Sequence, residues 1–323
     1  TKSFSLDQHG FREALYDPDR KKNAMVAGGS AAFGWGLENN EKTFVYKLGQ
    51  LNNEYNFVNA SVSGYLSGQE LSQMVHYLDD FEPAFYIVFD GWDDINDPYM
   101  FTDKWPVDFG PIGFNNTFFM IEENLGAHFQ KYKKWNTKDP QIKGAGKPLG
   151  RTQYFDEICK KYSSNISKMN SFAASRKAVF LLVFQPELGN KKRKSKEELV
   201  LLKSWNASYG YLDRETPAMY KIFVERAKES FSAEKIPFID INEYAEFSED
   251  STTLFFDCVH PNNKGHEIIA GIISDAVAGM AAEKEAAAGA QADSSTVQIE
   301  DKDTGMTADS AAAGDTVENG LPD

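Results

Sequence analysis

Two short segments, far apart in the chain, contain residue types that together can perform nucleophilic chemistry. One is Gly28-Gly29-Ser30, which follows a short apolar stretch, and the other is Asp257-Cys258-Val259-His260-Pro261. A serine hydroxyl becomes a nucleophile when a histidine takes its proton, and that histidine needs a carboxylate to fix its tautomer. Asp257 and His260 are three residues apart, a spacing that points both side chains to the same side of a turn. These residues predict a relay of Ser30, His260 and Asp257.

Each segment also has a simpler structural explanation. Ser30 fits the N-cap of a helix, and Asp257 fits a negative charge at a helix N-terminus. The Ser30 segment lacks the Gly-Lys-Ser/Thr ending of a phosphate-binding loop, and Ala32 replaces the second glycine of the G-x-S-x-G motif. Of the five histidines, only His260 has a carboxylate at this spacing and is followed by a proline and a predicted helix.

The rest of the chain alternates between strand-like and helix-like patterns. We expect strands at 23–27, 57–61, 84–89, 177–184 and 236–241, and helices at 41–51, 68–78, 217–231 and 263–280. The helix at 68–78 is expected to bury Leu71, Met74, Val75 and Leu78. Continuous apolar strands between helices predict a parallel sheet covered on both faces, which is a three-layer α/β/α fold. Ligands bind at the carboxyl ends of such strands, and Ser30 follows one of them.

Two stretches depart from this alternation. Residues 96–150 hold several prolines and many aromatic side chains with little periodicity. We interpret them as an irregular insertion beside the sheet, with a partly disordered linker as the alternative. Residues 284–323 carry nine acidic and two basic residues and almost no large apolar ones. This composition predicts a disordered acidic tail and leaves residues 1–283 as the folded domain.

The composition excludes several classes of protein. A net charge of −14 argues against binding to nucleic acid, and the 41% of apolar residues argues against disorder of the whole chain. No apolar run approaches the length of about 18 residues that a membrane span needs. The two cysteines, Cys159 and Cys258, lack metal-binding or redox spacing, although a disulfide stays open. The chain begins at Thr1, so the protein is extracytoplasmic if an upstream signal or anchor was removed and cytoplasmic otherwise.

Four segments, in order along residues 10–280, resemble the conserved blocks of the SGNH, or GDSL-type, hydrolase family. Gly28-Gly29-Ser30 is similar to the first block, with Gly29 where better-known members have aspartate. Residues 58–65, with Gly64, resemble the second block. Asp90-Gly91-Trp92-Asp93-Asp94 resembles the third block, Gly-x-Asn-Asp, and Asp257-x-x-His260-Pro261 resembles the last.

This resemblance implies a flavodoxin-like sheet with Ser30 as nucleophile, His260 as base and Asp257 as its orienting carboxylate. It also implies an oxyanion hole made by the backbone N–H groups of Ser30 and Gly64 and by the side chain at position 93, where the family has asparagine. An ionised Asp93 cannot donate a hydrogen bond, and loss of one donor costs about 2.7–4 kcal/mol in the transition state. Three explanations stay open: burial keeps Asp93 protonated, Asn96 supplies the donor, or the enzyme is slow or inactive.

The substrate-binding candidates follow the third block and a central strand. Trp92 begins an aromatic-rich stretch that fits either a platform for sugar rings and acyl chains or the insertion's own core. Gln185 lies in the segment 184–188, which resembles SGNH members encoded with polysaccharide export systems. Both side chains are predicted to contact the substrate.

The acidic residues after the third strand, Asp90, Asp93, Asp94 and Asp97, do not have the spacing of a calcium loop. We expect them to fix the loop through backbone hydrogen bonds, and we expect neither a metal nor an organic cofactor.

The predicted function is a serine esterase that hydrolyses small O-acyl esters, including O-acetyl groups on carbohydrate. Two alternatives stay open: a weakly active or inactive SGNH-fold binding protein, and an O-acyltransferase that uses the same triad. The sequence does not fix the oligomeric state.

Overall fold

The computed structural model describes residues 4–20, 22–95, 151–208 and 216–297. The chain divides into two compact units, Thr1–Ala276 and Val277–Asp323. All five strands of the sheet lie in the first unit, and the predicted insertion at 96–150 lies outside the described residues.

A parallel five-stranded sheet forms the centre of the first unit, in the order β2-β1-β3-β4-β5. Its strands are β1 (Lys22–Gly28), β2 (Tyr55–Asn59), β3 (Phe85–Asp90), β4 (Val179–Phe184) and β5 (Phe238–Asp240). Every residue of β3 is buried, as expected for a central strand covered on both faces. The register pairs Gly28 with Phe89, so β1 and β3 end side by side at the same edge.

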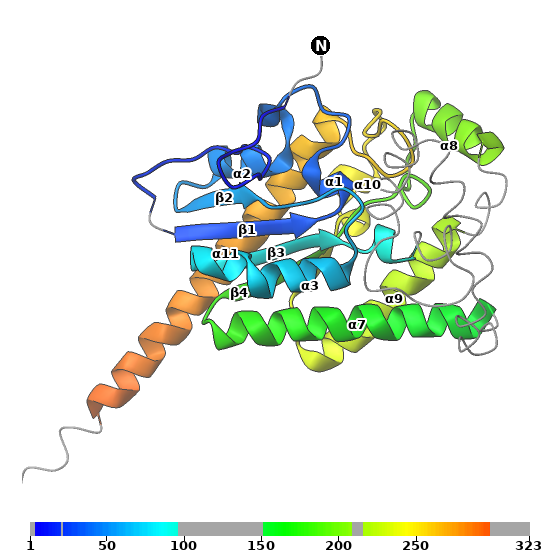
Figure 1. Cartoon of the computed structure of the whole chain (residues 1–323). Coiled ribbons are helices and arrows are strands. Elements are labelled where there is room, and N and C mark those ends of the chain that lie inside the picture. Colours follow the sequence, from blue (N-terminus) through cyan, green and yellow to red (C-terminus); the bar gives the residue numbers. More distant parts are fainter. Residues whose placement is uncertain (1–3, 21, 96–150, 209–215, 298–323) are drawn as a thin grey trace, which may run out of the picture. The chain divides into compact units, whose positions relative to one another are not determined.

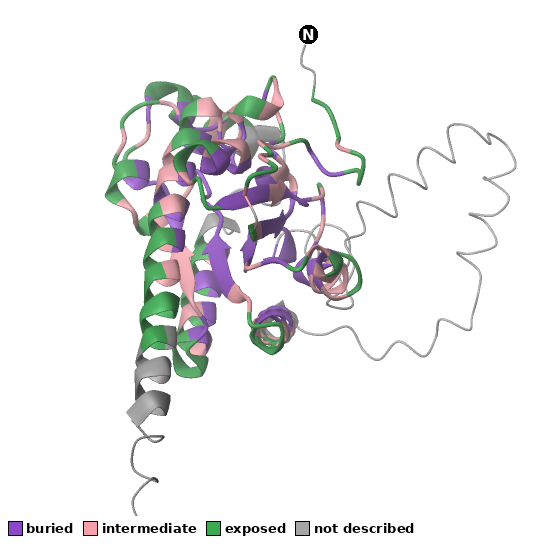
Figure 2. Cartoon of the chain, turned by 90° about the vertical axis from the view of Figure 1, so that its left-hand side faces the viewer, coloured by how far each residue is buried: buried purple, intermediate pink, exposed green. Residues whose placement is uncertain are grey.

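Helices cover both faces of the sheet, as Figures 1 and 2 show. On one side lie α3 (Ser67–His76), α7 (Arg151–Ser175) and α9 (Thr216–Glu234), with α7 packed against both other helices and β4. On the other side lie α2 (Phe44–Leu51) and the first turns of α11 (Asn263–Val297). The shorter or peripheral helices are α1 (Ser30–Phe33), α8 (Lys196–Ser208), α10 (Ala245–Ser248) and the 3-10 turns at Asn40–Lys42, Leu78–Phe81 and Ile241–Glu243.

The predicted three-layer α/β/α fold is confirmed, and each expected strand is present with boundaries shifted by a few residues. The sequence did not predict α7 and α8. The buried face of α3 also differs from expectation, because Ser67, Glu70 and Met74 are its buried residues. None of the helices in the described ranges combines the length and the apolar character needed to cross a bilayer.

The last helix extends further than the sequence predicted. We expected it to end near residue 280 and a disordered tail to begin at residue 284, whereas α11 continues to Val297. The residues from 281 to 297 are rich in alanine, which has the highest helix propensity of all residues, and this accounts for the extension. The part of the predicted tail at 298–323 lies outside the described residues.

Candidate active site

Ser30 lies at the tight turn where β1 passes into α1. Gly28, the last residue of β1, has φ 155°, and a Cβ atom there would lie 2.4 Å from the Phe89 carbonyl oxygen and 2.6 Å from the Ala32 side chain. Only glycine therefore lets β1 and β3 approach so closely at this edge. The glycine brings Ser30 to the carboxyl end of the sheet, as the sequence predicted.

The three residues of the predicted relay lie within hydrogen-bond distance of one another. Ser30 Oγ is 2.8 Å from His260 Nε2, and His260 Nδ1 is 2.6 Å from Asp257 Oδ2. The other carboxylate oxygen, Asp257 Oδ1, accepts hydrogen bonds from the backbone N–H groups of Val259 (2.8 Å) and His260 (2.9 Å). With its carboxylate on Nδ1, the histidine presents Nε2 to the serine as the acceptor a general base needs.

Asp257 is held in its ionised form. Burial alone would raise the pKa of this carboxyl group, but the hydrogen bonds from the His260 ring and from two backbone N–H groups outweigh it, and its pKa lies below the usual value. A negative Asp257 is in position to stabilise a positive charge on the His260 ring.

Backbone hydrogen bonds fix the loop that carries Asp257 and His260. Phe256 N donates to the His260 carbonyl, Leu188 N donates to the Cys258 carbonyl (2.8 Å), and Asn262 N donates to the Leu254 carbonyl (2.7 Å). These bonds tie the loop to itself and to the segment after β4.

A buried ion pair next to the same loop holds it in place. Lys191 Nζ donates to both oxygens of Glu198, at 2.8 and 2.7 Å, and also to the Thr252 carbonyl at 2.8 Å. Glu198 in turn accepts from Leu254 N (2.7 Å) at the start of the loop. Both charged side chains are fully buried. The segment after β4 thus anchors the loop that carries His260.

Asp93 is buried beside the serine. A Cβ atom on Gly29 would lie 2.1 Å from Asp93 Oδ2, so the carboxyl group packs directly on the backbone next to Ser30. Burial raises the pKa of Asp93 to about 7; the nearby His260 opposes this rise, and Asp94 adds a smaller increase. The side chain is therefore protonated in a substantial fraction of molecules near neutral pH. Asn96, the alternative donor, lies outside the described residues.

Gly64, the other predicted oxyanion residue, lies in the loop after β2. It has φ 79°, a left-handed conformation that favours glycine. Val62 N, in the same loop, donates to the Gly28 carbonyl (2.9 Å), and the Tyr65 carbonyl lies 3.6 Å from a Cβ position built on Gly29. The loop that carries Gly64 thus lies directly against the Gly-Gly-Ser turn.

Three further carboxyl groups lie next to Asp93, and they differ in their partners. Asp94 accepts from the backbone N and the Oγ of Ser67, at 2.9 and 2.5 Å, and so caps the first turn of α3 as a loop-fixing residue would. Glu70 and Asp90 are fully buried, and no donor with hydrogen-bond geometry reaches their oxygens in the described part of the chain. Glu70, Asp90, Asp93 and Asp94 are called the carboxyl cluster below.

The cluster does not form a metal site in the part of the chain that the structure describes. No group of three or more His, Cys, Asp or Glu side chains is arranged there to hold a metal ion. Asp97, the fourth acid in the sequence motif, lies outside the described residues. The two cysteines are free thiols, which answers the question of a disulfide.

The two predicted substrate-binding side chains point into the protein interior. Trp92 is 4% exposed and packs edge-on against Tyr220, with ring centroids 5.4 Å apart. Gln185 is 2% exposed, and its backbone carbonyl accepts from the Tyr220 hydroxyl at 2.8 Å. Packing of this kind disfavours direct contact of either side chain with a substrate.

Two exposed aromatic residues that the sequence did not single out border the relay instead. The Trp35 ring lies 6.2 Å from the His260 ring, and Trp35 is 56% exposed. Phe256 is 41% exposed and packs on Gly36, where a Cβ would lie 2.9 Å from its ring. The sequence signal that could have identified Trp35 is its position five residues after Ser30, but Trp35 lies outside the four segments that resemble family blocks.

The chain belongs to the GDSL-like lipase/acylhydrolase family, whose family model matches residues 26–273. It is therefore a hydrolase that acts on esters, with an SGNH-type α/β fold. The family match confirms the resemblance that the sequence motifs indicated.

Solved structures with a similar fold come from several bacteria. A G-D-S-L family protein from Desulfitobacterium hafniense is 14% identical, with 79% of this chain and 99% of that chain covered and a TM-score of 0.45. The psychrotrophic esterase EstA from a Pseudoalteromonas species is 15% identical, with 80% and 98% covered and a TM-score of 0.45. A GDSL-like lipase from Bacteroides thetaiotaomicron is 15% identical, with 80% and 89% covered and a TM-score of 0.44. A search of curated proteins found no match.

Proposed function

We propose that this protein is a serine esterase that cleaves small O-acyl esters through Ser30, His260 and Asp257. The observation that carries the proposal is the continuous hydrogen-bonded relay from Ser30 Oγ through both nitrogens of His260 to Asp257. Each neighbouring pair is within 2.8 Å, and the histidine ring is oriented by a carboxylate that is itself held by two backbone N–H groups.

In the proposed reaction, Ser30 Oγ attacks the ester carbonyl carbon while its proton passes to His260 Nε2. The tetrahedral intermediate collapses when the C–O bond to the alcohol breaks, and His260 gives its proton to that alcohol. A water molecule then attacks the acyl-serine, again losing a proton to His260, and releases the carboxylic acid. Asp257 stays ionised throughout.

The oxyanion would receive hydrogen bonds from the backbone N–H groups of Ser30 and Gly64 and from a protonated Asp93. Packing of the Asp93 carboxyl on Gly29 and a pKa raised to about 7 support this role. A carboxylic acid that stays neutral through burial can donate where an asparagine otherwise would. Above pH 7 the same group becomes an acceptor with a negative charge, which opposes the developing oxyanion.

The proposed substrate is an O-acyl ester whose alcohol component is, for example, a hydroxyl group of a carbohydrate. Exposed Trp35 beside His260 supports a substrate with a face that can stack on an aromatic ring. The ionisable Asp93 favours one competing reading, namely a weakly active or inactive member of the fold that binds rather than cleaves.

The first test compares the wild type with Ser30→Ala at pH 6, using p-nitrophenyl acetate hydrolysis and labelling by a fluorophosphonate probe. We expect the variant to lose both labelling and at least a thousandfold of the rate, because the nucleophile is absent. Ser175→Ala, at the exposed end of α7, serves as the matched control and should behave as the wild type. Labelling of Ser30→Ala equal to that of the wild type would remove Ser30 from the mechanism, and absence of labelling in both would favour the binding protein.

The second test follows kcat/KM from pH 5 to 9 in the wild type and in Asp93→Asn. The donating form of Asp93 exists below its pKa of about 7, so the wild-type rate should fall about tenfold per pH unit above that value. An asparagine donates at every pH, so the variant should keep its rate at pH 8 and 9. If the alkaline decline is the same in both proteins, Asp93 does not contribute a proton-dependent donor.

A further inference from the structure

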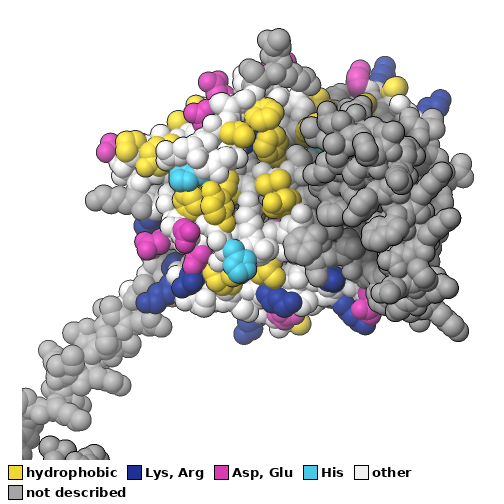
Figure 3. Space-filling view, viewed as in Figure 1, with side chains coloured by type: hydrophobic (Ala, Val, Ile, Leu, Met, Phe, Trp, Pro, Cys, Tyr) yellow, Lys and Arg dark blue, Asp and Glu magenta, His cyan; other side chains and the backbone are white. Residues whose placement is uncertain are grey.

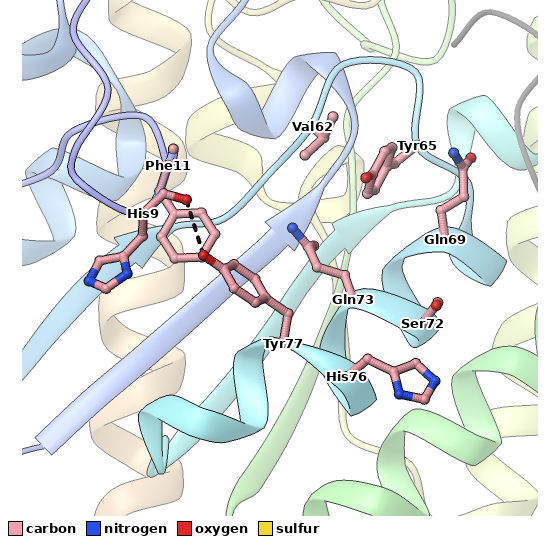
Figure 4. A pocket seen from close by; sticks show the side chains of 10 residues that line it. His9, Phe11, Val62, Tyr65, Gln69, Ser72, Gln73, His76 and Tyr77 are labelled. Carbon is pink, nitrogen blue, oxygen red and sulfur yellow. Dashed lines mark hydrogen bonds between the residues drawn. The ribbon is translucent and has the colours of Figure 1, made fainter. Parts of the chain in front are cut away.

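A cavity of about 470 Å³ opens between α3 and the N-terminal segment, outside the relay described above. Figure 4 shows the lining side chains of α3 below those of the loop after β2, with Tyr77 reaching His9 in the N-terminal segment. Its volume falls within the range of small-molecule sites. The lining consists of His9, Gly10, Phe11, Val62, Tyr65, Gln69, Ser72, Gln73, His76 and Tyr77.

The lining combines an apolar surface with uncharged polar groups, and it contains no Asp, Glu, Lys or Arg side chain. A quarter of the whole chain consists of these charged residues, so their absence from a solvent-accessible cavity is selective. Figure 3 shows this face of the molecule, where hydrophobic and other uncharged side chains occupy the area between two histidines and most charged side chains lie toward the margin. Such a lining suits neither a phosphate nor a carboxylate ligand, which would require cationic partners.

Helix α3 supplies the hydrogen-bonding groups of the cavity. Gln69, Ser72, Gln73 and His76 are spaced at i, i+3, i+4 and i+7 and therefore share one face of the helix. The opposite face of the same helix buries Glu70 and Met74 in the protein core. The cavity thus receives a row of amide, hydroxyl and imidazole groups from a rigid element.

Gln73 presents an acceptor that is already fixed in place. Its Nε2 donates to the Ala60 carbonyl at 2.9 Å, which sets the orientation of the amide. Its Oε1 is buried, and within the described residues no donor reaches it. A buried carbonyl oxygen without a partner is unfavourable, so a small turn of the amide that opens Oε1 to the cavity and to a ligand hydroxyl there would relieve this cost.

Aromatic side chains complete the walls. Tyr77 donates its hydroxyl to the His9 carbonyl at 3.1 Å, and its ring packs on the Phe11 ring with centroids 5.5 Å apart. Tyr65 faces Gln69 from the loop after β2 (Figure 4). Aromatic rings next to amides and hydroxyls match the alternating apolar faces and hydroxyl edges of a pyranose ring.

The cavity and the proposed oxyanion hole share one loop. Val62 and Tyr65 line the cavity, and Gly64 lies between them. The Val62 N–H is bonded to the Gly28 carbonyl, two residues before Ser30. A ligand anchored in the cavity would therefore be bound beside the Gly-Gly-Ser turn.

We propose that this cavity is a binding subsite for an uncharged sugar unit, so that the ester carried to Ser30 belongs to a neutral oligosaccharide. The subsite would define the substrate class of the proposed esterase. Only its effect on catalysis rests on that proposed function, because sugar binding itself does not require the relay.

The test titrates the Ser30→Ala protein with three neutral pentasaccharides, mannopentaose, xylopentaose and cellopentaose, and follows the side-chain amide signals of glutamine by NMR. We expect at least one sugar to shift the signals of Gln73 and Gln69, and Gln73→Met to weaken its binding at least tenfold. Gln50→Met, at the exposed end of α2, is the matched control and should bind as the parent does. If none of the three sugars shifts these signals at 10 mM, the inference is wrong.

A second variant guards against a folding defect in Gln73→Met, because Gln73 also holds the Ala60 carbonyl. Ser72→Trp fills the cavity from α3 without removing that hydrogen bond. In the enzyme with Ser30 intact, we expect this variant to raise KM for the acetylated form of the sugar that binds at least fivefold, while kcat/KM for p-nitrophenyl acetate stays within twofold. An unchanged KM would overturn the subsite.

The two proposals fail separately. Sugar binding to the Ser30→Ala protein, together with no fluorophosphonate labelling of the wild type, would refute the proposed esterase activity and support the subsite. Normal labelling without any sugar binding would sink the subsite alone.

Discussion

Two regions at the carboxyl end of the sheet bury acidic side chains in opposite ways. In the loop-supporting region, Glu198 receives Lys191 Nζ on both oxygens and two backbone N–H groups, from Ser195 and Leu254. In the carboxyl cluster, Glu70 and Asp90 are equally buried, yet no donor with hydrogen-bond geometry reaches their oxygens among the described residues. The comparison teaches that burial alone does not decide the charge of an acid, because the donors around it do.

The two regions consequently carry different charge states next to the same relay. Desolvation raises the pKa of Glu70 and of Asp90 well above the usual values, and the neighbouring carboxyl groups raise both further. The weak interaction of Asp90 with the Gly91 N–H does not offset this effect. The loop of His260 is thus held by an ion pair, whereas Asp93 borders two carboxyl groups, Glu70 and Asp90, whose raised pKa values favour the neutral form.

The largest effect is expected from breaking the ion pair. Lys191→Met leaves the Glu198 carboxylate buried without its cation, which should lower the free energy of unfolding by about 3–5 kcal/mol at pH 7. Urea denaturation followed by circular dichroism measures this loss. Glu198 holds Leu254 at the start of the loop that carries His260. The variant should therefore lose esterase activity at urea concentrations well below the denaturation midpoint of the wild type.

The neighbouring pair Lys192–Glu249 is the matched control, since both side chains are more than half exposed and their charged atoms are 3.5 Å apart. Lys192→Met should change the free energy of unfolding by less than about 1 kcal/mol. The double variant Lys191→Met/Glu198→Leu should recover most of the loss, because it removes the unpaired charge. Equal losses in the two lysine variants would show that burial of the pair does not matter.

A smaller effect is expected from Asp93→Asn. The folded-state pKa of about 7 lies above the value of 3.8 for a free aspartate, so the folded protein binds more protons between these pH values. Stability from this group is therefore full below about pH 4 and decreases as the pH rises to about 7. The variant lacks this decrease and should exceed the wild type in stability by on the order of 2 kcal/mol at pH 8, with a smaller gain at pH 5.

Thermal unfolding at pH 4, 5, 6, 7 and 8 gives the required profile. Asp80→Asn, an exposed acid in the 3-10 turn Leu78–Phe81, is the matched control and should show no gain that depends on pH. A gain for Asp93→Asn that is the same at pH 4 and pH 8 would mean that the aspartate is ionised in the folded protein at every pH tested.

The relay could be predicted from sequence because its determinants are local. Asp257 and His260 are three residues apart, and Ser30 directly follows a strand and two glycines, one of which permits the close approach of β1 and β3. The carboxyl ends of parallel strands meet at one edge of the sheet, where ligands bind. The whole fold class was accessible for the same reason.

The supports of the relay could not be predicted, because they depend on pairing across the chain. Lys191 begins a run of four basic residues, and nothing in the sequence distinguishes it from the other three, yet the structure buries it against Glu198. In α3 the hydrophobic pattern assigned Leu71 and Val75 to the core, but Glu70 is the fully buried residue. A hydropathy pattern treats every glutamate as charged, so it cannot identify one that is buried as a neutral acid.

The smallest effect is expected from Glu70→Gln, which replaces a neutral acid by a neutral amide. The pKa of Glu70 is raised by burial, so its folded form binds more protons than the unfolded chain above about pH 4.5, and stability falls as the pH rises from there. One N–H of the glutamine can donate to the adjacent Asp90, while the other lacks an acceptor and offsets part of the gain. We expect the free energy of unfolding of Glu70→Gln, measured by thermal unfolding, to exceed that of the wild type by about 1 kcal/mol at pH 8 and to show no gain at pH 4. The exposed control Glu267→Gln should match the wild type at both pH values. A loss of stability at pH 8 would contradict a raised pKa of Glu70 in the folded protein.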